Sequence, residues 1–187
     1  MEQVAAVVLA GGGARRFGAD KLEARLGTAR LLDRALETVT AVGASPVVVV
    51  GPPRDGLGPH VTVVREDPPG TGPVAGLAAG LAVVGEVAIV LVLAGDLVAP
   101  APAVPELLAA LAAHPGADGA VVVDVEGRRQ PLLAAYRVDA LRSALAAAPA
   151  EGRSLRDLLA GLHVEEVVDG GGWSRDVDRP EDLRTTE

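Results

Sequence analysis

Short, Val-rich apolar runs alternate along most of this 187-residue chain with segments of helical periodicity. Continuous apolar runs without alternating polar residues are typical of strands buried on both faces. The expected strands are 4–9, 46–50, 61–64, 87–94, 119–125, 131–136 and 164–168, and the expected helices are 31–42, 74–84, 105–113, 138–148 and 154–161. Strands that alternate with helices form βαβ units, whose right-handed crossovers place helices on both faces of a mostly parallel sheet. The pattern therefore predicts a three-layer α/β/α fold.

A single domain, residues 1–187, is expected to contain all of these elements. A chain of this length has enough residues for one well-buried core, and no linker separates two regions of different composition. The Gly- and Pro-rich segment 51–59 is expected to be a surface loop, because the strands on either side of it are too few to fold alone.

Composition argues against several classes of function. The chain has no cysteine, which excludes disulfides and thiolate sites, and its three histidines are scattered. Its apolar stretches are too short to span a membrane, and no basic region precedes the first of them, so we expect a cytoplasmic protein without a signal peptide. A formal net charge of −8 argues against nucleic acid as a partner. We expect a monomer or a weak homo-oligomer.

Lys21 is the only lysine among the 17 Lys and Arg residues, and it ends a glycine-rich segment that follows the first expected strand. Three glycines at 11–13 let backbone N–H groups approach a ligand closely, and such a nest binds anions. Arg15, Arg16 and Arg25 add positive charge to the same segment of an acidic protein. Lysine is a compact charge on a thin stem, suited to a single phosphate oxygen. The segment is therefore expected to bind a phosphate-bearing ligand.

Two familiar glycine motifs do not fit this segment. A dinucleotide-binding fingerprint would need a glycine where Arg16 stands. Gly13 to Gly18 has the spacing of a P-loop, but Ala19-Asp20 follows in place of Lys-Ser/Thr. The failed fingerprint disfavours a nicotinamide-dependent oxidoreductase.

Six segments, in order along nearly the whole chain, carry a more specific pattern. Residues 9–21 match Leu-Ala-Gly-Gly-x-x-x-Arg-[Met/Phe]-Gly-x-Asp-Lys. The others are 66–77 (Glu-Asp-Pro-Pro-Gly-Thr-Gly-Pro-Val-Ala-Gly-Leu), Gly95-Asp96 after a strand, 130–136 (Gln-Pro-Leu-Leu-Ala-Ala-Tyr), 153–155 (Arg-Ser-Leu) and 176–183 (Asp-Val-Asp-Arg-Pro-Glu-Asp-Leu). Together they resemble the nucleotidyltransferase family that includes the molybdenum-cofactor guanylyltransferases, and more loosely the cytidylyltransferases and sugar-phosphate nucleotidyltransferases.

The resemblance implies a fold and an activity. The fold is of the nucleotide-diphosphosugar-transferase type, which is Rossmann-like. The activity is Mg²⁺-dependent transfer of a nucleoside monophosphate from an NTP to a phosphate-bearing acceptor, with release of pyrophosphate. GTP is the favoured donor, and molybdopterin cofactor is the favoured acceptor.

The resemblance also implies roles for individual residues. The base and ribose would be contacted by Leu9, Ala10, Gly11 and Gly12, and the phosphates by Gly12, Gly13, Arg16 and Lys21. Asp67 and Gly72 would line the base pocket. Arg16, Lys21 and Asp96 would be catalytic, and Asp96 would hold Mg²⁺ with help from Asp178 or Asp176.

Elementary charge balance supports the same site. Nucleotidyl transfer must neutralise the charge of a triphosphate and of an attacking phosphate, so it needs cations and a divalent metal held by hard carboxylate oxygens. Open α/β sheets bind ligands just past the carboxyl ends of their central strands, where Asp96 is expected. The protein then supplies positioning and charge stabilisation more than covalent chemistry.

Base preference and the second metal ligand stay open at this level. Leu9 to Gly12 favours guanine, but the chain lacks the asparagine that guanylyltransferases often have near Gly51, and Asp176-x-Asp178 replaces Asn-x-Asn. Within the class, the alternative is a cytidylyltransferase of the same cofactor pathway or a transferase for another sugar or metabolite phosphate. From another class, it is a catalytically inactive nucleotide-binding module. We favour Asp178 over Asp176 as the second ligand, because it lies beside an expected helix start at Pro180.

Overall fold

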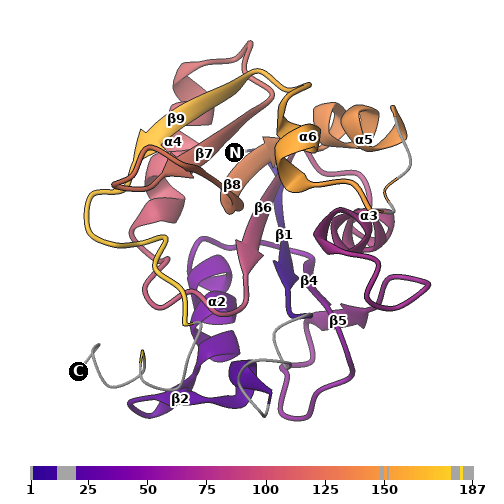
Figure 1. Ribbon diagram of the computed structural model, residues 1–187, viewed down its shortest axis with the longest axis vertical. Coiled ribbons are helices and arrows are strands. Elements are labelled where there is room, and N and C mark those ends of the chain that lie inside the picture. Colours follow the sequence, from indigo (N-terminus) through magenta and orange to yellow (C-terminus); the bar gives the residue numbers. More distant parts are fainter. Residues whose placement is uncertain (1, 12–19, 148–149, 151, 178–181, 183–187) are drawn as a thin grey trace.

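A seven-stranded sheet forms the centre of the computed structural model, which describes residues 2–11, 20–147, 150, 152–177 and 182 (Figure 1). Its strands, in the spatial order β5-β4-β1-β6-β8-β7-β9, are β1 (Val4–Leu9), β4 (Val47–Val50), β5 (Val61–Val64), β6 (Ile89–Ala94), β7 (Gly119–Val123), β8 (Arg129–Arg137) and β9 (Val164–Val168). β5, β4, β1 and β6 pair in parallel, β8 is antiparallel to both β6 and β7, and β9 is parallel to β7. The expectation of a mostly parallel sheet is confirmed.

Helices cover both faces of this sheet because its central strands are apolar on both sides. α3 (Pro73–Val83), α5 (Val138–Ala146) and α6 (Leu155–Leu159) pack on one face, together with Val90 and Val92 of β6. α2 (Leu31–Ala41) and α4 (Ala103–Ala113) pack on the other face, together with Leu91 and Leu93. Successive side chains of a strand point to opposite faces, so one unbroken apolar run supplies both cores. The three layers that the sequence predicts are visible in Figure 1.

Local signals begin two of the helices where the sequence places them. Pro73 occupies the first turn of α3, where its missing N–H leaves no helical hydrogen bond unmade. Ser154 caps α6, since its Oγ accepts a hydrogen bond from the N–H of Asp157 at 3.1 Å. Within the described residues, the helices are too short or too polar to cross a membrane.

The connection between the glycine-rich segment and α2 contains elements that apolar periodicity does not predict. η1 (Lys21–Glu23) is a single 3-10 turn, and β2 (Arg25–Leu26) pairs with β3 (Ala29–Arg30) in a small hairpin. Gly27 in the hairpin turn has a φ of 64°, a left-handed conformation that glycine adopts without strain. Elements of two or three residues are too short to show a period, so their tertiary contacts define them.

The turn between β7 and β8 also differs from the expected strands 119–125 and 131–136. β7 ends at Val123 and β8 already begins at Arg129. Asp124 sets this boundary, because its Oδ1 accepts hydrogen bonds from the N–H groups of Glu126 and Arg128, both at 2.9 Å. Side-chain capping of a turn therefore shortens one strand and lengthens the other.

Gly80 allows α3 to lie close against the sheet. A Cβ at this position would lie 2.7 Å from Cγ1 of Val7 and 3.0 Å from Cγ2 of Val50, two buried strand residues. At Gly76, one turn earlier on the same helix, a Cβ would make only ordinary contacts at 3.5 Å and 3.6 Å. The two glycines therefore differ in how much space surrounds them.

We predict that Gly80→Ala lowers the free energy of unfolding by about 1–3 kcal/mol, because overpacking against branched side chains outweighs the better helix propensity of alanine. Gly76→Ala is the matched control, and it should leave stability unchanged or raise it by up to about 1 kcal/mol. Urea unfolding of both variants measures the difference. Equal stability of the two variants would contradict the close approach at Gly80.

Candidate active site

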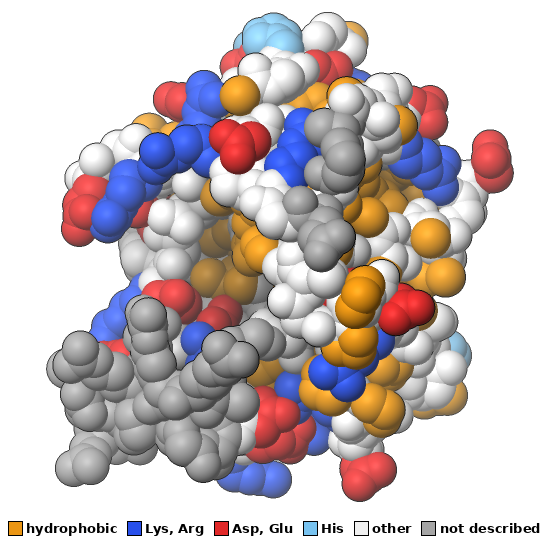
Figure 2. All heavy atoms as spheres, turned by 45° about the vertical axis from the view of Figure 1, so that its right-hand side comes forward, with side chains coloured by type: hydrophobic (Ala, Val, Ile, Leu, Met, Phe, Trp, Pro, Cys, Tyr) orange, Lys and Arg blue, Asp and Glu red, His pale blue; other side chains and the backbone are white. Residues whose placement is uncertain are grey.

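The carboxyl ends of β1, β4 and β6 are level with one another and open into a cleft. Leu9 is in register with Val50 on one side and with Ala94 on the other. The cleft comprises two adjoining cavities of about 280 Å³ and about 220 Å³. The lining residues that both share are Leu9, Gly11, Glu66, Gly70 and Asp96. In Figure 2 this face of the molecule is hollowed, with apolar side chains inside the hollow and charged side chains along its rim.

Lys21 and Asp96 form an ion pair that borders the first cavity. Their side chains are only 11% and 16% exposed. Lys21 Nζ also donates a hydrogen bond to the carbonyl oxygen of Val177 at 3.0 Å. Charges so well shielded from water need partners, because an unpaired buried charge strongly destabilises a fold. The pair therefore joins three distant segments of the chain at one point.

Lys21 is placed by its neighbours in η1. The side chain of Leu22 is buried and packs with Val8, Leu32 and Val49. Gly95 makes room for it, since a Cβ there would lie 3.3 Å from Cδ1 of Leu22. The hydrophobic anchor at Leu22 thus directs the adjacent lysine toward the end of β6.

Arg54 lines the first cavity from the loop after β4, and the sequence reasoning missed it. Its side chain is only 4% exposed. Nη2 donates to the carbonyl oxygen of Ala10 at 3.0 Å, and Nη1 pairs with Asp20 and, at 3.1 Å, with Glu23. A single arginine in a Gly- and Pro-rich loop carries no periodic signal, so only its tertiary contacts identify it.

The segment before α3 lines both cavities through Glu66. Its Oε1 accepts a hydrogen bond from the N–H of Gly70 at 2.8 Å, which closes the loop between β5 and α3. Asp67, to which the resemblance assigns the base pocket, is exposed and does not line either cavity. The carboxylate of this segment that faces the cleft is therefore that of Glu66.

The other candidate residues divide into those at the cleft and those outside the described residues. Leu9, Ala10 and Gly11 line the first cavity, and Gly72 lines the second. Their binding roles stay predictions. Gly12, Gly13, Arg16 and Asp178 lie outside the described residues. Asp176 is exposed, and its backbone forms an isolated bridge with Leu97, next to Asp96.

A buried carboxylate, Asp169, shapes the segment that returns to the site after β9. Its oxygens accept hydrogen bonds of 2.7 to 3.0 Å from the N–H groups of Gly171, Trp173 and Ser174 and from the Ser174 hydroxyl. Burial by itself would raise the pKa of Asp169, but these hydrogen bonds together lower the pKa to about 2. The segment then reaches Val177, whose N–H donates to the carbonyl oxygen of Asp96 at 3.2 Å.

The chemistry of Asp96 fits a divalent cation. Its carboxylate offers hard oxygen ligands and lines both cavities. Mg²⁺ is usually held by one or two carboxylates together with substrate phosphates, rather than by a cage of protein ligands. Among the described residues, no group of three His, Cys, Asp or Glu side chains could hold a metal ion. The carboxylate of Asp96 therefore fits a Mg²⁺ whose other ligands a bound triphosphate would supply.

Sequence comparisons relate the chain to a known family. Residues 6–167 match the family model described as the MobA-like NTP transferase domain. A probable molybdenum cofactor guanylyltransferase from Chloroflexus aggregans is 32% identical over 163 residues, which cover 84% of this chain and 76% of the relative. A probable molybdenum cofactor guanylyltransferase from Mycobacterium avium is 30% identical over 172 residues, which cover 89% and 85%.

Solved structures with the same fold include nucleotidyltransferases. Molybdopterin-guanine dinucleotide biosynthesis protein A from Archaeoglobus fulgidus has a TM-score of 0.73 at 23% identity, covering 97% of this chain and 96% of that one. The 2-C-methyl-D-erythritol 4-phosphate cytidylyltransferase from Thermus thermophilus has a TM-score of 0.69 at 22% identity, covering 98% and 97%. At these identities the likeness is one of fold.

We predict that Asp169→Asn lowers the free energy of unfolding at pH 7 by about 2 kcal/mol, because the amide loses charge-assisted hydrogen bonds. Since the folded-state pKa of Asp169 is lowered to about 2, its contribution is present above pH of about 4 and is lost as the pH falls through about 2. The stability difference between wild type and Asp169→Asn should therefore shrink in acid. Urea unfolding at several pH values measures it, and a difference independent of pH would contradict the role of the carboxylate.

Proposed function

The chain belongs to the family of MobA-like NTP transferase domains, and on this basis we propose that it transfers GMP from GTP to a molybdopterin-type acceptor and releases pyrophosphate. The observation that carries the proposal is the pairing of Lys21 with Asp96 at a cleft of two adjoining cavities. A lysine ammonium and a strand-end carboxylate are the two charges that a triphosphate and its Mg²⁺ require. The names of the relatives from Chloroflexus aggregans and Mycobacterium avium support guanine and the molybdenum cofactor.

In the proposed reaction, a phosphate oxygen of the acceptor attacks the α-phosphorus of GTP. A new P–O bond joins the acceptor to GMP, the bond from the α-phosphorus to the bridging oxygen breaks, and pyrophosphate leaves with that electron pair. Mg²⁺ held by Asp96 and the phosphates would supply positive charge to the triphosphate. Lys21 would exchange its pairing with Asp96 for phosphate oxygens, so that its ammonium stabilises the charge that develops on the leaving group.

Two ligands must meet for this reaction, and the shape of the cleft suits that requirement. The two cavities adjoin one another and share Asp96. The first is also lined by Lys21 and Arg54, and the second by Gly72. We assign the triphosphate to the first cavity, because it is the one of the two that basic side chains line, those of Lys21, Arg54 and Arg65.

Lys21→Ala should lower turnover by about 10²-fold or more, because a charge positioned for the transition state is removed. It should also lower the free energy of unfolding, because Asp96 loses its partner. Lys21→Arg should restore little activity, since the planar guanidinium fork does not replace a point charge. Release of pyrophosphate from GTP and acceptor is the measurement, and circular dichroism checks the fold. Near-normal turnover of Lys21→Ala would remove Lys21 from the active site.

GTP should bind at least about tenfold more tightly than CTP at equal Mg²⁺. A pocket that hydrogen-bonds the edge of a purine leaves buried groups unpaired when a pyrimidine enters, and each loss costs about 1–3 kcal/mol. Competition binding measures the ratio directly. A preference for CTP would contradict the assignment as a guanylyltransferase and favour a cytidylyltransferase of the same pathway. Nucleotide binding without turnover of any NTP would favour an inactive nucleotide-binding module.

A further inference from the structure

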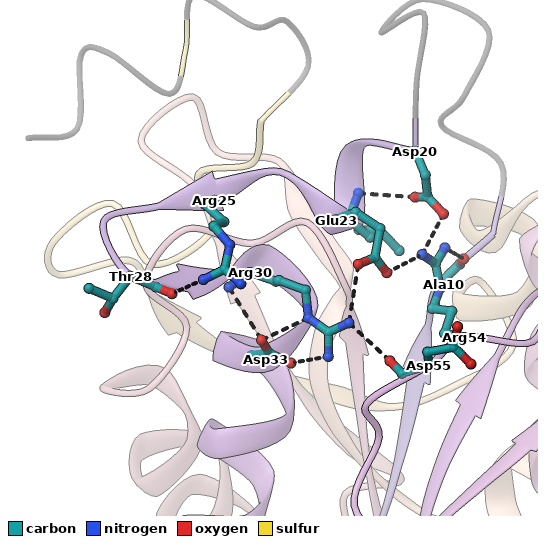
Figure 3. Close-up of polar contacts among 10 residues, drawn as sticks. Ala10, Asp20, Glu23, Arg25, Thr28, Arg30, Asp33, Arg54 and Asp55 are labelled. Carbon is teal, nitrogen blue, oxygen red and sulfur yellow. Dashed lines mark hydrogen bonds and ion pairs between the residues drawn. The ribbon is translucent and has the colours of Figure 1, made fainter.

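Two arginines enclose the carboxylate of Glu23, two residues after Lys21 (Figure 3). Oε1 of Glu23 accepts a hydrogen bond from Arg54 Nη1 at 3.1 Å, and Oε2 accepts one from Arg30 Nη1 at 3.1 Å. Arg30 is held in turn by Asp33, which accepts from its Nε at 2.9 Å and from its Nη2 at 2.8 Å. A chain of alternating charges therefore runs from the loop after β4 to the first turn of α2.

Arg54 also connects the two ends of the segment that separates β1 from Lys21. Its Nη2 donates to the carbonyl oxygen of Ala10, directly after β1, and its Nη1 pairs with Asp20, directly before Lys21. The loop that carries Arg54 lies close to Ala10, because a Cβ at Gly51 would be only 2.6 Å from the carbonyl oxygen of Ala10. One guanidinium thus links the end of a central strand to the residues on both sides of the lysine.

The side chain of Arg54 is more deeply buried than the two carboxylates that it binds. Its side chain is 4% exposed, whereas those of Asp20 and Glu23 are 42% and 44% exposed. A guanidinium this deeply buried must stay paired, and its planar fork fixes the direction of each hydrogen bond. The buried arginine therefore helps to orient both carboxylates, together with the N–H of Leu22, which donates to Asp20, and with Arg30, which donates to Glu23.

We propose that Arg54 is a positioning residue for Lys21: by binding Asp20 and Glu23 it fixes the backbone on both sides of the lysine and so directs the ammonium into the cleft. The proposal rests on the proposed function in one respect, that Lys21 acts on a phosphate. The lysine stem is flexible, so the direction of its charge depends on the backbone that carries it. A displacement of about 1 Å is enough to lower turnover by about 10²-fold.

The single lysine allows a direct test that needs no turnover. Isotope-labelled lysine marks one backbone amide of the chain, and its NMR signal reports on Lys21 alone. Arg54→Ala should shift or broaden that signal. Glu23→Gln should change the signal to a smaller extent. Because the side chain of Glu23 is 44% exposed, this variant should stay folded, and it provides the test if Arg54→Ala unfolds the protein.

Arg137→Ala is the matched control for this experiment. Arg137 also donates hydrogen bonds to backbone carbonyls, those of Ala117 at 3.0 Å and Leu111 at 3.3 Å. It lies far from the site, because in the sheet it is in register with Ile89, at the opposite end of β6 from Asp96. Its replacement should leave the lysine signal unchanged. An unchanged signal in both Arg54→Ala and Glu23→Gln would overturn the proposal.

A double-mutant cycle on turnover separates positioning from stability. In the wild-type background, Arg54→Ala should lower turnover about tenfold or more. In the Lys21→Ala background, the same substitution should lower turnover less than about threefold, because the effects of substituting residues that act as one unit are not additive. Arg54→Lys should recover only part of the loss, since one ammonium does not reach all three partners. Additive losses would overturn the proposal. If wild type shows no GTP-dependent turnover, the proposed function fails, and the lysine signal still decides whether Arg54 positions Lys21.

Discussion

The ion pair between Lys21 and Asp96 is the interaction around which the cleft is arranged. Lys21 follows the glycine-rich segment, Asp96 follows β6, and the carbonyl that also binds the lysine belongs to Val177, 156 residues away in the sequence. Both charged side chains are shielded from water, so each depends on the other for compensation. The packing of Leu22 and the return of the segment after Asp169 bring these groups together.

Close packing of small residues makes this arrangement possible in a chain of which only 2% of the residues are aromatic. Gly51, Gly80 and Gly95 lack the Cβ atoms that would meet Ala10, the strand β1 and Leu22. β1, β4 and β6 end level with one another. Side chains just past these ends are held in place by the sheet. An enzyme of the MobA-like NTP transferase family requires charges that are positioned in this way. The site is thus built on strand ends, and its loops attach to them through the Lys21–Asp96 ion pair and the hydrogen bond from Arg54 to the carbonyl oxygen of Ala10.

Local signals in the sequence predict their elements correctly, whereas contacts between distant segments leave no such signal. The strands 4–9, 61–64 and 164–168 have the bounds that their apolar runs predict, and the helix expected from residue 154 begins at Leu155 with Ser154 as its cap. The hairpin of β2 and β3 is too short to show a period, and Asp124 ends β7 through side-chain hydrogen bonds that no periodicity encodes. At the site, Asp96 was accessible to prediction because a strand end precedes it, and Lys21 because it completes a glycine-rich motif. Arg54 and Asp169 had no such pattern around them, and in the motif segment that begins with Glu66 the resemblance pointed to Asp67 instead.

The sequence by itself determined the order along the chain of the longer strands and helices, the burial of the central strands on both faces, and the presence of one lysine beside a glycine-rich turn. These follow from relations between neighbours in the chain, which periodicity and motif spacing record. Only the tertiary structure decided that Arg54 binds Asp20 and Glu23, and that a carbonyl near the C-terminus binds Lys21. Two charged groups pair when the packed sheet brings them within about 3 Å of each other and shields them from water. The choice of partners is therefore a property of the assembled core, and no single segment of the sequence records it.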